Sequence, residues 1–107
     1  MIESHVAINS NVTKILSPQQ LVNCAQNPLK CGGTGGCEGA VVELAFNYAQ
    51  LFGIASEESI PYVGQDQKCT FDGVNVKAEV QIDGYERLPS NDQYSVMWHL
   101  VNKGILN

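Results

Sequence analysis

Residues 16–40, LSPQQLVNCAQNPLKCGGTGGCEGA, are the most informative part of the sequence for the fold. Its first third predicts the start of a helix. Ser17 can cap that helix, and Pro18 falls at the first helical position, where a missing N–H costs nothing. Gln20 can complete a capping box with Ser17. We expect this helix to end near residues 24–26.

The second half of the stretch is a loop rich in glycine and cysteine. Four glycines fall within residues 31–37, so the backbone must turn tightly there or approach another group closely. A second helix is predicted from about Gly39 to Phe52, and Gly53 is suited to end it. The apolar stripe of this segment is broad, which predicts a well-buried helix.

Outside this stretch the pattern predicts three further elements. Residues 2–8 are typical of the last turns of a helix, and residues 76–82 alternate as a half-buried strand does. A last helix is expected after a capping box at residues 90–93, and Gly104 should end it. The side chains of this helix that we expect to face inward are Tyr94, Met97, Trp98 and Val101.

Length and charge exclude several classes of function. The chain has 107 residues, enough for one small domain or a piece of one. Its net charge of −5 argues against nucleic acid or an anionic membrane surface as a partner. No apolar run approaches the roughly 20 residues of a membrane span, and residues 1–5 lack the features of a secretory signal.

Four cysteines are many for so short a chain: Cys24, Cys31, Cys37 and Cys69. Their number and loop setting favour disulfides, and hence a secreted or endolysosomal compartment. A zinc site is the weaker interpretation, because the spacings do not match the paired cysteines of structural zinc sites. We therefore predict no metal and no cofactor. The triplet Asn11-Val12-Thr13 is a glycosylation sequon, which would suit the same compartment.

No catalytic residue can be assigned from the sequence. A reactive cysteine needs a base nearby and gains from a position at a helix N-terminus. Cys37 comes closest, but its neighbouring cysteines favour a bonded, inert thiol. The two imidazoles, His5 and His99, are interpreted as surface or packed side chains. The adjacent carboxylates of residues 57–58 are interpreted as solvated.

The order of motifs resembles that of papain-like cysteine proteases, including the cathepsins. That family has Leu-Ser-x-Gln-x-Leu-x-x-Cys, then Gly-Cys-x-Gly-Gly, a helix rich in alanine and aromatic residues, and a Tyr-Pro-Tyr segment followed by a cysteine. The ordered match covers nearly the whole chain, through residues 16–24, 36–40, 45–48, 53–57, 60–62, 69 and 101–105.

The resemblance implies an α+β fold that is part of the papain-like one. Residues 1–82 would form most of the helical left domain, and residues 83–107 would begin the right-hand β-barrel domain. By the same resemblance, Cys24 would pair with Cys69, and Cys37 with a cysteine that this chain lacks. Cys31 is extra to the common pattern, and could pair with Cys37, bridge to another chain or stay free.

The resemblance also implies a substrate-binding wall at residues 39–42. The backbone of Gly39 and Ala40 would pair with an extended peptide, as an added strand does. Val41 and Val42 would line a pocket for an apolar side chain. Ala40 stands where the family usually has glycine. The alternative interpretation is that the glycines only shape a disulfide loop.

In this family the nucleophile would precede Met1 and the catalytic histidine would follow Asn107, so the chain alone is not expected to be catalytic. The first hypothesis is a fragment of a papain-family cysteine peptidase that hydrolyses peptides once another segment or chain completes it. The second is a catalytically dead module, a structural or interaction subunit whose partners cover exposed apolar surface. The third is a secreted, disulfide-stapled binding domain. The family implies an endolysosomal or secreted location.

Overall fold

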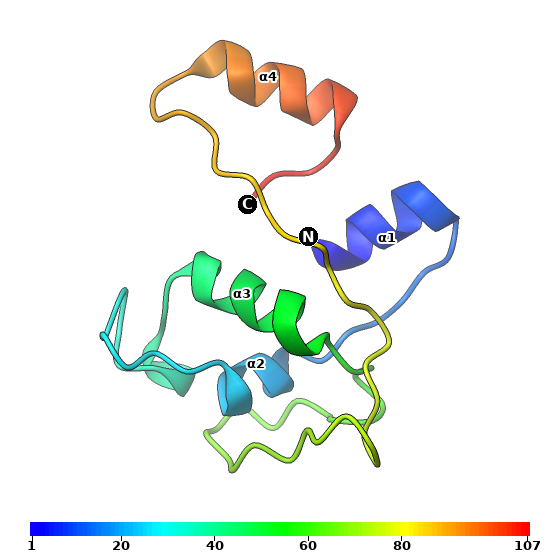
Figure 1. Ribbon diagram of the computed structural model, residues 1–107, viewed down its shortest axis with the longest axis vertical. Helices are drawn as coiled ribbons and strands as arrows, with labels where there is room; N and C mark the ends of the chain where they lie inside the picture. Colours follow the sequence, from blue (N-terminus) through cyan, green and yellow to red (C-terminus); the bar gives the residue numbers. More distant parts are fainter. The chain divides into compact units, whose positions relative to one another are not determined.

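A computed structural model describes residues 1–107. It contains four α-helices and one 3-10 helix, in the order α1 (Ile2–Ser10), α2 (Pro18–Cys24), η1 (Gly36–Glu38), α3 (Val42–Phe52) and α4 (Gln93–Asn102) (Figure 1). None of the helices has the length and apolar character that crossing a membrane requires.

The chain forms two compact units. The central unit is the continuous segment Leu16–Tyr85, and the terminal unit combines Met1–Ile15 with Glu86–Asn107. The division at residues 82 and 83 that the family resemblance implies stays a prediction.

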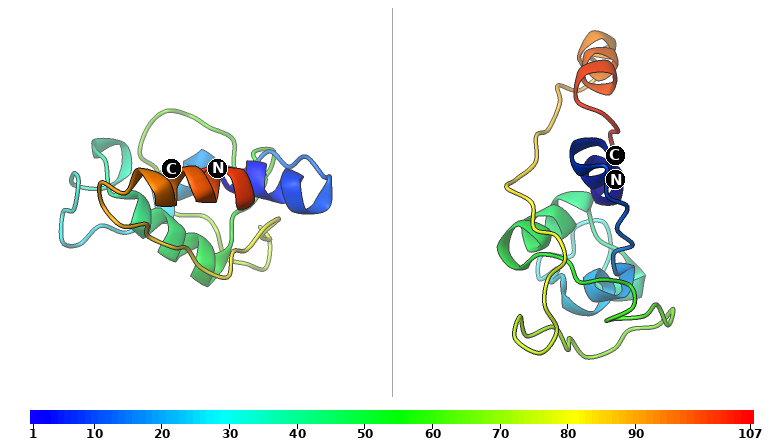
Figure 2. Two further views of the ribbon diagram at one scale, coloured as in Figure 1. Left: turned by 90° about the horizontal axis from the view of Figure 1, so that it is seen from above. Right: turned by 90° about the vertical axis from the view of Figure 1, so that its right-hand side faces the viewer.

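The core of the central unit is small. Its buried apolar side chains are Leu16, Tyr48, Ala49, Ile54, Ala55 and Ile60, and its buried polar side chains are Ser17, Gln19 and Gln20. Two isolated antiparallel bridges tie the irregular segment after α3 into this core, joining Leu16 to Ser56 and Ile54 to Val80. Residues 53–85 contain no helix and no continuous strand, as both views in Figure 2 show.

Helix α2 begins as predicted, with one difference in its cap. The Ser17 hydroxyl accepts a hydrogen bond from the Gln20 backbone N–H at 3.0 Å, and Pro18 follows the cap. The predicted capping box is wrong, because the side chain of Gln20 does not turn back to the cap. It is fully buried and bonds to three groups elsewhere in the unit.

Helix α3 begins three residues later than the sequence predicted. Gly39 has φ 94° and ψ 161°, which is not helical, and it ends the 3-10 helix η1 instead. Gly53 ends α3 as predicted, with φ 76°. The prediction of a broadly buried helix is wrong, because only two of its side chains are buried. The exposed fractions of Val42, Leu51 and Phe52 are 45%, 70% and 53%.

The predicted strand at residues 76–82 does not form. Only Val80 forms a bridge, to Ile54, whose carbonyl also accepts from the Glu79 N–H, and no second strand runs beside the segment. Alternation of apolar and polar residues makes a strand only when a neighbouring strand takes up its backbone hydrogen bonds. Upstream, the Asp72 carboxylate accepts hydrogen bonds from the N–H groups of Val74 and Val76, which turns the chain there.

The terminal unit holds α1 and α4, neither of which has a buried residue. Helix α4 is capped by Asp92, whose carboxylate accepts a hydrogen bond from the Ser95 N–H at 3.1 Å. The capping box expected from Ser90 is therefore wrong, because the cap lies two residues further along the chain. The expected inward face of α4 is also wrong. Its members Tyr94, Met97, Trp98 and Val101 are 76%, 56%, 42% and 84% exposed.

The two ends of the chain meet inside the terminal unit. The Nε2 atom of His5 lies 2.8 Å from the Ile105 carbonyl oxygen. Gly104, which follows α4, has φ 110°, and a Cβ placed on it would lie 3.1 Å from Ile8. Glycine is therefore favoured there by the backbone angle, and the close approach of Ile8 adds to that preference.

Candidate functional site

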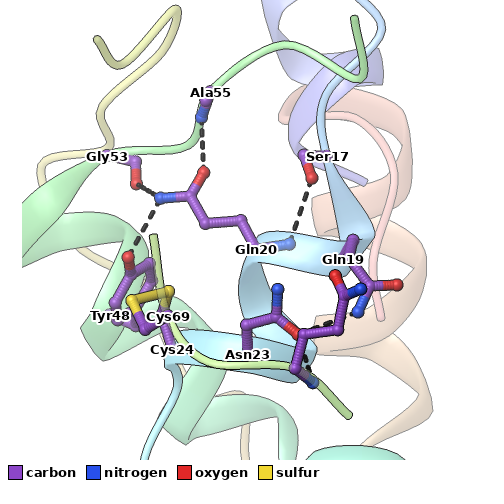
Figure 3. Close-up of a disulfide and its surroundings, with 10 residues drawn as sticks. Ser17, Gln19, Gln20, Asn23, Cys24, Tyr48, Gly53, Ala55 and Cys69 are labelled. Carbon is purple, nitrogen blue, oxygen red and sulfur yellow. Dashed lines mark hydrogen bonds between the residues drawn. A yellow bond between two sulfur atoms is a disulfide. The ribbon is translucent and has the colours of Figure 1, made fainter. Parts of the chain in front are cut away.

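A buried glutamine organises the central unit. The amide of Gln20 donates to the Tyr48 hydroxyl at 3.0 Å and to the Gly53 carbonyl at 3.1 Å, and its oxygen accepts from the Ala55 N–H at 2.7 Å (Figure 3). Burial raises the pKa of Tyr48 above its usual value of 10.0, against a smaller opposing effect of the Gln20 hydrogen bond. This network joins α2 to both ends of the turn that follows α3.

A second buried glutamine holds the segment after the core. The Gln19 side chain accepts from the Val63 N–H at 3.0 Å and donates to the Gln65 carbonyl at 2.8 Å. It also donates to the Asn23 side-chain oxygen (Figure 3). That oxygen also accepts from the Gln67 N–H at 3.1 Å. Residues 63–67 are therefore bound to α2 along their length.

A disulfide closes the same connection. Cys24, at the end of α2, is bonded to Cys69, with a Cα–Cα distance of 4.9 Å (Figure 3). This confirms the pairing that the family resemblance implied. Cys31 and Cys37 are free and exposed, so the local bridge between them, one of the alternatives open from the sequence, is not formed.

Residues 63–67, the segment anchored on α2, hold the glycine loop in place. Asp66 accepts a hydrogen bond from the Cys37 N–H at 2.9 Å. Gly36, with φ 52°, lies directly against this carboxylate, and a Cβ there would collide with it. Glycine at this position therefore permits both the left-handed backbone and the approach of Asp66.

Asn27 binds the loop from within. Its side-chain oxygen accepts from the Cys31 N–H at 2.8 Å. Its amide nitrogen lies 3.0 Å from the Cys31 and Gly33 carbonyl oxygens and 3.3 Å from that of Gly39. We did not single out Asn27 from the sequence as a functional residue. The only signal was its place before Pro28, which is typical of a turn.

The four residues of the predicted wall lead from the loop into α3, with Gly39 half-buried and the other three exposed, and their backbones differ. The Gly39 N–H donates to the Gly36 carbonyl, and its own carbonyl accepts from the Gly35 N–H at 2.9 Å. Ala40 is exposed, its φ is not positive, and neither its N–H nor its carbonyl has a partner in the chain. The side chains of Val41 and Val42 are 36% and 45% exposed. Within the wall, Ala40 is the residue whose backbone is open to a ligand.

An open depression of about 590 Å³ borders the glycine loop. It is lined by α2, the following turn, the glycine loop with η1, and residues 66–67, including Val22, Asn27, Gly36, Glu38 and Asp66. None of its lining residues belongs to the wall at 39–42.

The remaining candidate groups are engaged in structural contacts. His99 Nδ1 lies 2.8 Å from the Ser95 carbonyl, and no hydrogen bond joins a histidine to a cysteine. The interpretation of Glu57 as a solvated side chain is wrong. One of its oxygens accepts from the Tyr62 N–H at 2.9 Å, and the other is buried without a partner. No group of three or more histidine, cysteine, aspartate or glutamate residues is arranged to hold a metal ion.

Comparisons with known proteins connect this arrangement to one family. The family model described as papain family cysteine protease matches residues 1–107. Cysteine protease 1 of Oryza sativa subsp. japonica is 40% identical over 82 residues, covering 76% of this chain and 16% of the relative. A senescence-specific cysteine protease of Arabidopsis thaliana is 36% identical over 97 residues, covering 90% of this chain and 26% of the relative. The chain thus spans about a sixth to a quarter of these relatives.

Solved structures show the same relationship. The digestive procathepsin L 3 of Tenebrio molitor larval midgut has a TM-score of 0.80 and 30% identity, covering 95% of this chain and 32% of that one. A Carica candamarcensis cysteine protease, solved in complex with E-64, has a TM-score of 0.78 at 24% identity, covering 94% and 44%. The fold of this chain is therefore part of the fold of these proteases.

Proposed function

Because the chain belongs to the papain family of cysteine proteases, we propose that it serves a peptide-bond hydrolase as the segment that carries one wall of the substrate cleft. The wall is residues 39–42. The open backbone of Ala40 is the observation that carries this assignment.

The wall has the properties of an edge that pairs with an extended peptide. A peptide that adds as a strand gains its affinity from main-chain hydrogen bonds and its specificity from pockets for alternate side chains. Ala40 offers one N–H and one carbonyl without competing partners in the chain. Beside it, Val41 and Val42 offer exposed apolar surface, which favours an apolar side chain in the substrate.

The wall is also held in place before any ligand arrives. Gln19 and Asn23 bind residues 63–67, Asp66 in that segment binds the Cys37 N–H, and Asn27 binds the loop at both ends. Each of these contacts reduces the conformational freedom that peptide binding would otherwise have to remove. We therefore expect Asp66→Leu to weaken peptide binding more than the matched variant Asp66→Asn, which keeps an acceptor oxygen.

Hydrolysis needs groups that this chain does not combine. An acyl-enzyme requires a nucleophile within hydrogen-bond reach of a base, and the imidazoles here bond to backbone carbonyls instead. In our proposal another segment or another chain supplies the nucleophile and the base. The chain alone should leave a fluorogenic peptide intact. Turnover that Cys37→Ser abolishes would contradict this part of the proposal.

The wall itself is tested by titrating the isotope-labelled chain with a short extended peptide that carries an apolar side chain. We expect amide shift changes centred on residues 39–42. Ala40→Pro removes the N–H and should weaken binding by roughly two- to tenfold, the equivalent of one hydrogen bond, whereas Ala40→Gly should not. Shift changes confined to the depression lined by Asn27 and Glu38, or equal binding by Ala40→Pro, would overturn the assignment.

The exposed side chains of α4 favour a second candidate, a catalytically dead structural or interaction subunit. Tyr94 and Val101 are 76% and 84% exposed, and large exposed apolar surface often marks an interaction site. Adding the missing segments separates the two functions. Peptidase activity on completion supports the first, whereas stable assembly without activity supports the second.

We also propose an endolysosomal or secreted location for the protein. The Cys24–Cys69 disulfide supports it, because such bonds persist in oxidising compartments.

A further inference from the structure

We propose that Asn11 carries an N-linked glycan. Asn11-Val12-Thr13 is the only Asn-x-Ser/Thr triplet in the chain, and its middle residue is not proline. The triplet belongs to the terminal unit, whereas the proposed wall belongs to the central unit. A test of the modification is therefore independent of the proposed function.

The structure leaves the triplet open to a modifying enzyme. Residues 11, 12 and 13 are all exposed, and no helix or strand includes them. Asn11 ends α1 in the left-handed conformation, with φ 55° and ψ 21°, and its backbone N–H donates to the Ala7 carbonyl at 3.0 Å. Asparagine is one of the few residues that adopt this conformation readily. The position is thus a helix end that presents its side chain at the surface.

The side chains that would react are unoccupied. Neither the Asn11 amide nor the Thr13 hydroxyl has a hydrogen-bond partner in the chain. Several other asparagines are different. The amide of Asn9 donates to the His5 carbonyl, that of Asn102 donates to the Trp98 carbonyl, and Asn27 binds the glycine loop. A glycan on Asn11 would therefore displace no contact of the folded chain.

The reaction takes its sugar from an oligosaccharide linked to a lipid through pyrophosphate. The Asn11 side-chain nitrogen forms a C–N bond to the anomeric carbon of that oligosaccharide, and the C–O bond to pyrophosphate breaks. The lipid pyrophosphate leaves, and the amide loses one proton. No oxidant or reductant takes part. The compartment that contains the transferring enzyme is oxidising, and it is therefore compatible with the Cys24–Cys69 disulfide.

The test is to translate the full chain behind a cleavable secretion leader in the presence of microsomes, and to score only protease-protected chains from which the leader has been removed. We expect one shift in mobility that an endoglycosidase reverses, and the mass of one glycan on the peptide that contains Asn11. Thr13→Ser should keep the glycan, whereas Thr13→Ala and Val12→Pro should abolish it. Because glycan transfer does not require the folded chain, a variant that fails to fold still gives a result.

Two results would overturn the proposal. One is a wild-type chain that is protease-protected and free of its leader but has an unmodified mass. The positive control in the same experiment is Lys77→Thr, which creates a second sequon at the exposed Asn75. The other is a glycan that persists in Asn11→Gln. In either case the triplet would be a chance match.

Discussion

The central and terminal units use the same local devices with different results. Both contain short helices whose first turns are capped by a side-chain oxygen, from Ser17 in one unit and from Asp92 in the other. All buried residues of the chain nevertheless lie between Leu16 and Ile60, in the central unit. In the terminal unit the helices are formed, but no side chain is buried.

This contrast shows what holds the central unit together. Its apolar core has only six side chains, and it has no continuous strand. Two buried glutamines and one disulfide connect α2 to segments that lie far away in the sequence. A buried polar group is tolerated when each of its polar atoms has a hydrogen-bond partner, and both polar atoms of the Gln20 amide have one. The following predictions test this contrast between the two units.

The largest effect is expected from Gln20→Leu. The substitution keeps an apolar volume but leaves the Ala55 N–H, the Gly53 carbonyl and the Tyr48 hydroxyl without their partner. Unpaired buried groups cost about 1–3 kcal/mol each, so we expect the free energy of unfolding to fall by about 3–5 kcal/mol. Denaturant unfolding followed by circular dichroism measures it. The matched control is Gln26→Leu, at an exposed position just after α2, which should change stability by no more than about 0.5 kcal/mol. Equal stability of the two variants would show that the buried amide is not what holds the central unit.

Loss of the disulfide should have the next largest effect. Cys69→Ser opens a connection between residues 45 positions apart and should lower the free energy of unfolding by about 2–4 kcal/mol. Cys31→Ser removes a free, exposed thiol and serves as the control, with no expected change. If the control variant were destabilised as much as Cys69→Ser, Cys31 would have a structural role that the contacts of the chain do not indicate.

The elements that depend on neighbouring residues were predictable from the sequence. The Ser17 cap, the end of α3 at Gly53 and the presence of a last helix all follow from residues within a few positions of each other. The Cys24–Cys69 pairing was predictable only through the family resemblance, because four cysteines allow more than one pairing.

The failures share one physical cause, which is that the outcome depends on distant partners. The alternation of apolar and polar residues at 76–82 carries no information on whether a second strand lies beside the segment, and none does. Gln20 fitted a capping box, yet its amide bonds to groups that follow it by 28 to 35 positions. The apolar pattern of α4 could not show that its side chains would stay exposed. At the candidate site, the resemblance placed the wall at 39–42, but no local signal predicted that Asp66 would hold the loop behind it.

The two caps allow a direct comparison between the units. Ser17→Ala removes a cap and also the hydrogen bond that the hydroxyl donates to the buried Ile60 carbonyl, so we expect a loss of about 1–2 kcal/mol in the free energy of unfolding. Asp92→Ala removes only a local cap at the start of α4. It should lower the helicity of α4 and leave the unfolding of the central unit unchanged. Amide shifts of α4 and denaturant unfolding, measured on both variants, separate the two effects. A change in the Ala55 amide in Asp92→Ala would contradict the expectation that this cap acts only locally.

Acid should have the smallest effect, and it should act on a turn at the surface of the central unit while the core stays intact. Hydrogen bonds from the N–H groups of Val76 and Val74 and from the Asn75 side chain lower the pKa of Asp72 from 3.8 to about 2. Because this pKa is lower in the folded turn than in the unfolded chain, the turn is stabilised above pH 3.8, and that stabilisation is lost as the pH falls through about 2. The Val76 amide shift, followed from pH 7 downward, should therefore titrate near 2, and in Asp72→Asn it should stay constant over the same range. The Ala55 amide, held by the uncharged Gln20, should not respond to acid in this range. Titration of Val76 near the ordinary carboxyl value would mean that Asp72 does not hold the turn, whereas a response from Ala55 would mean that the core depends on an ionised group.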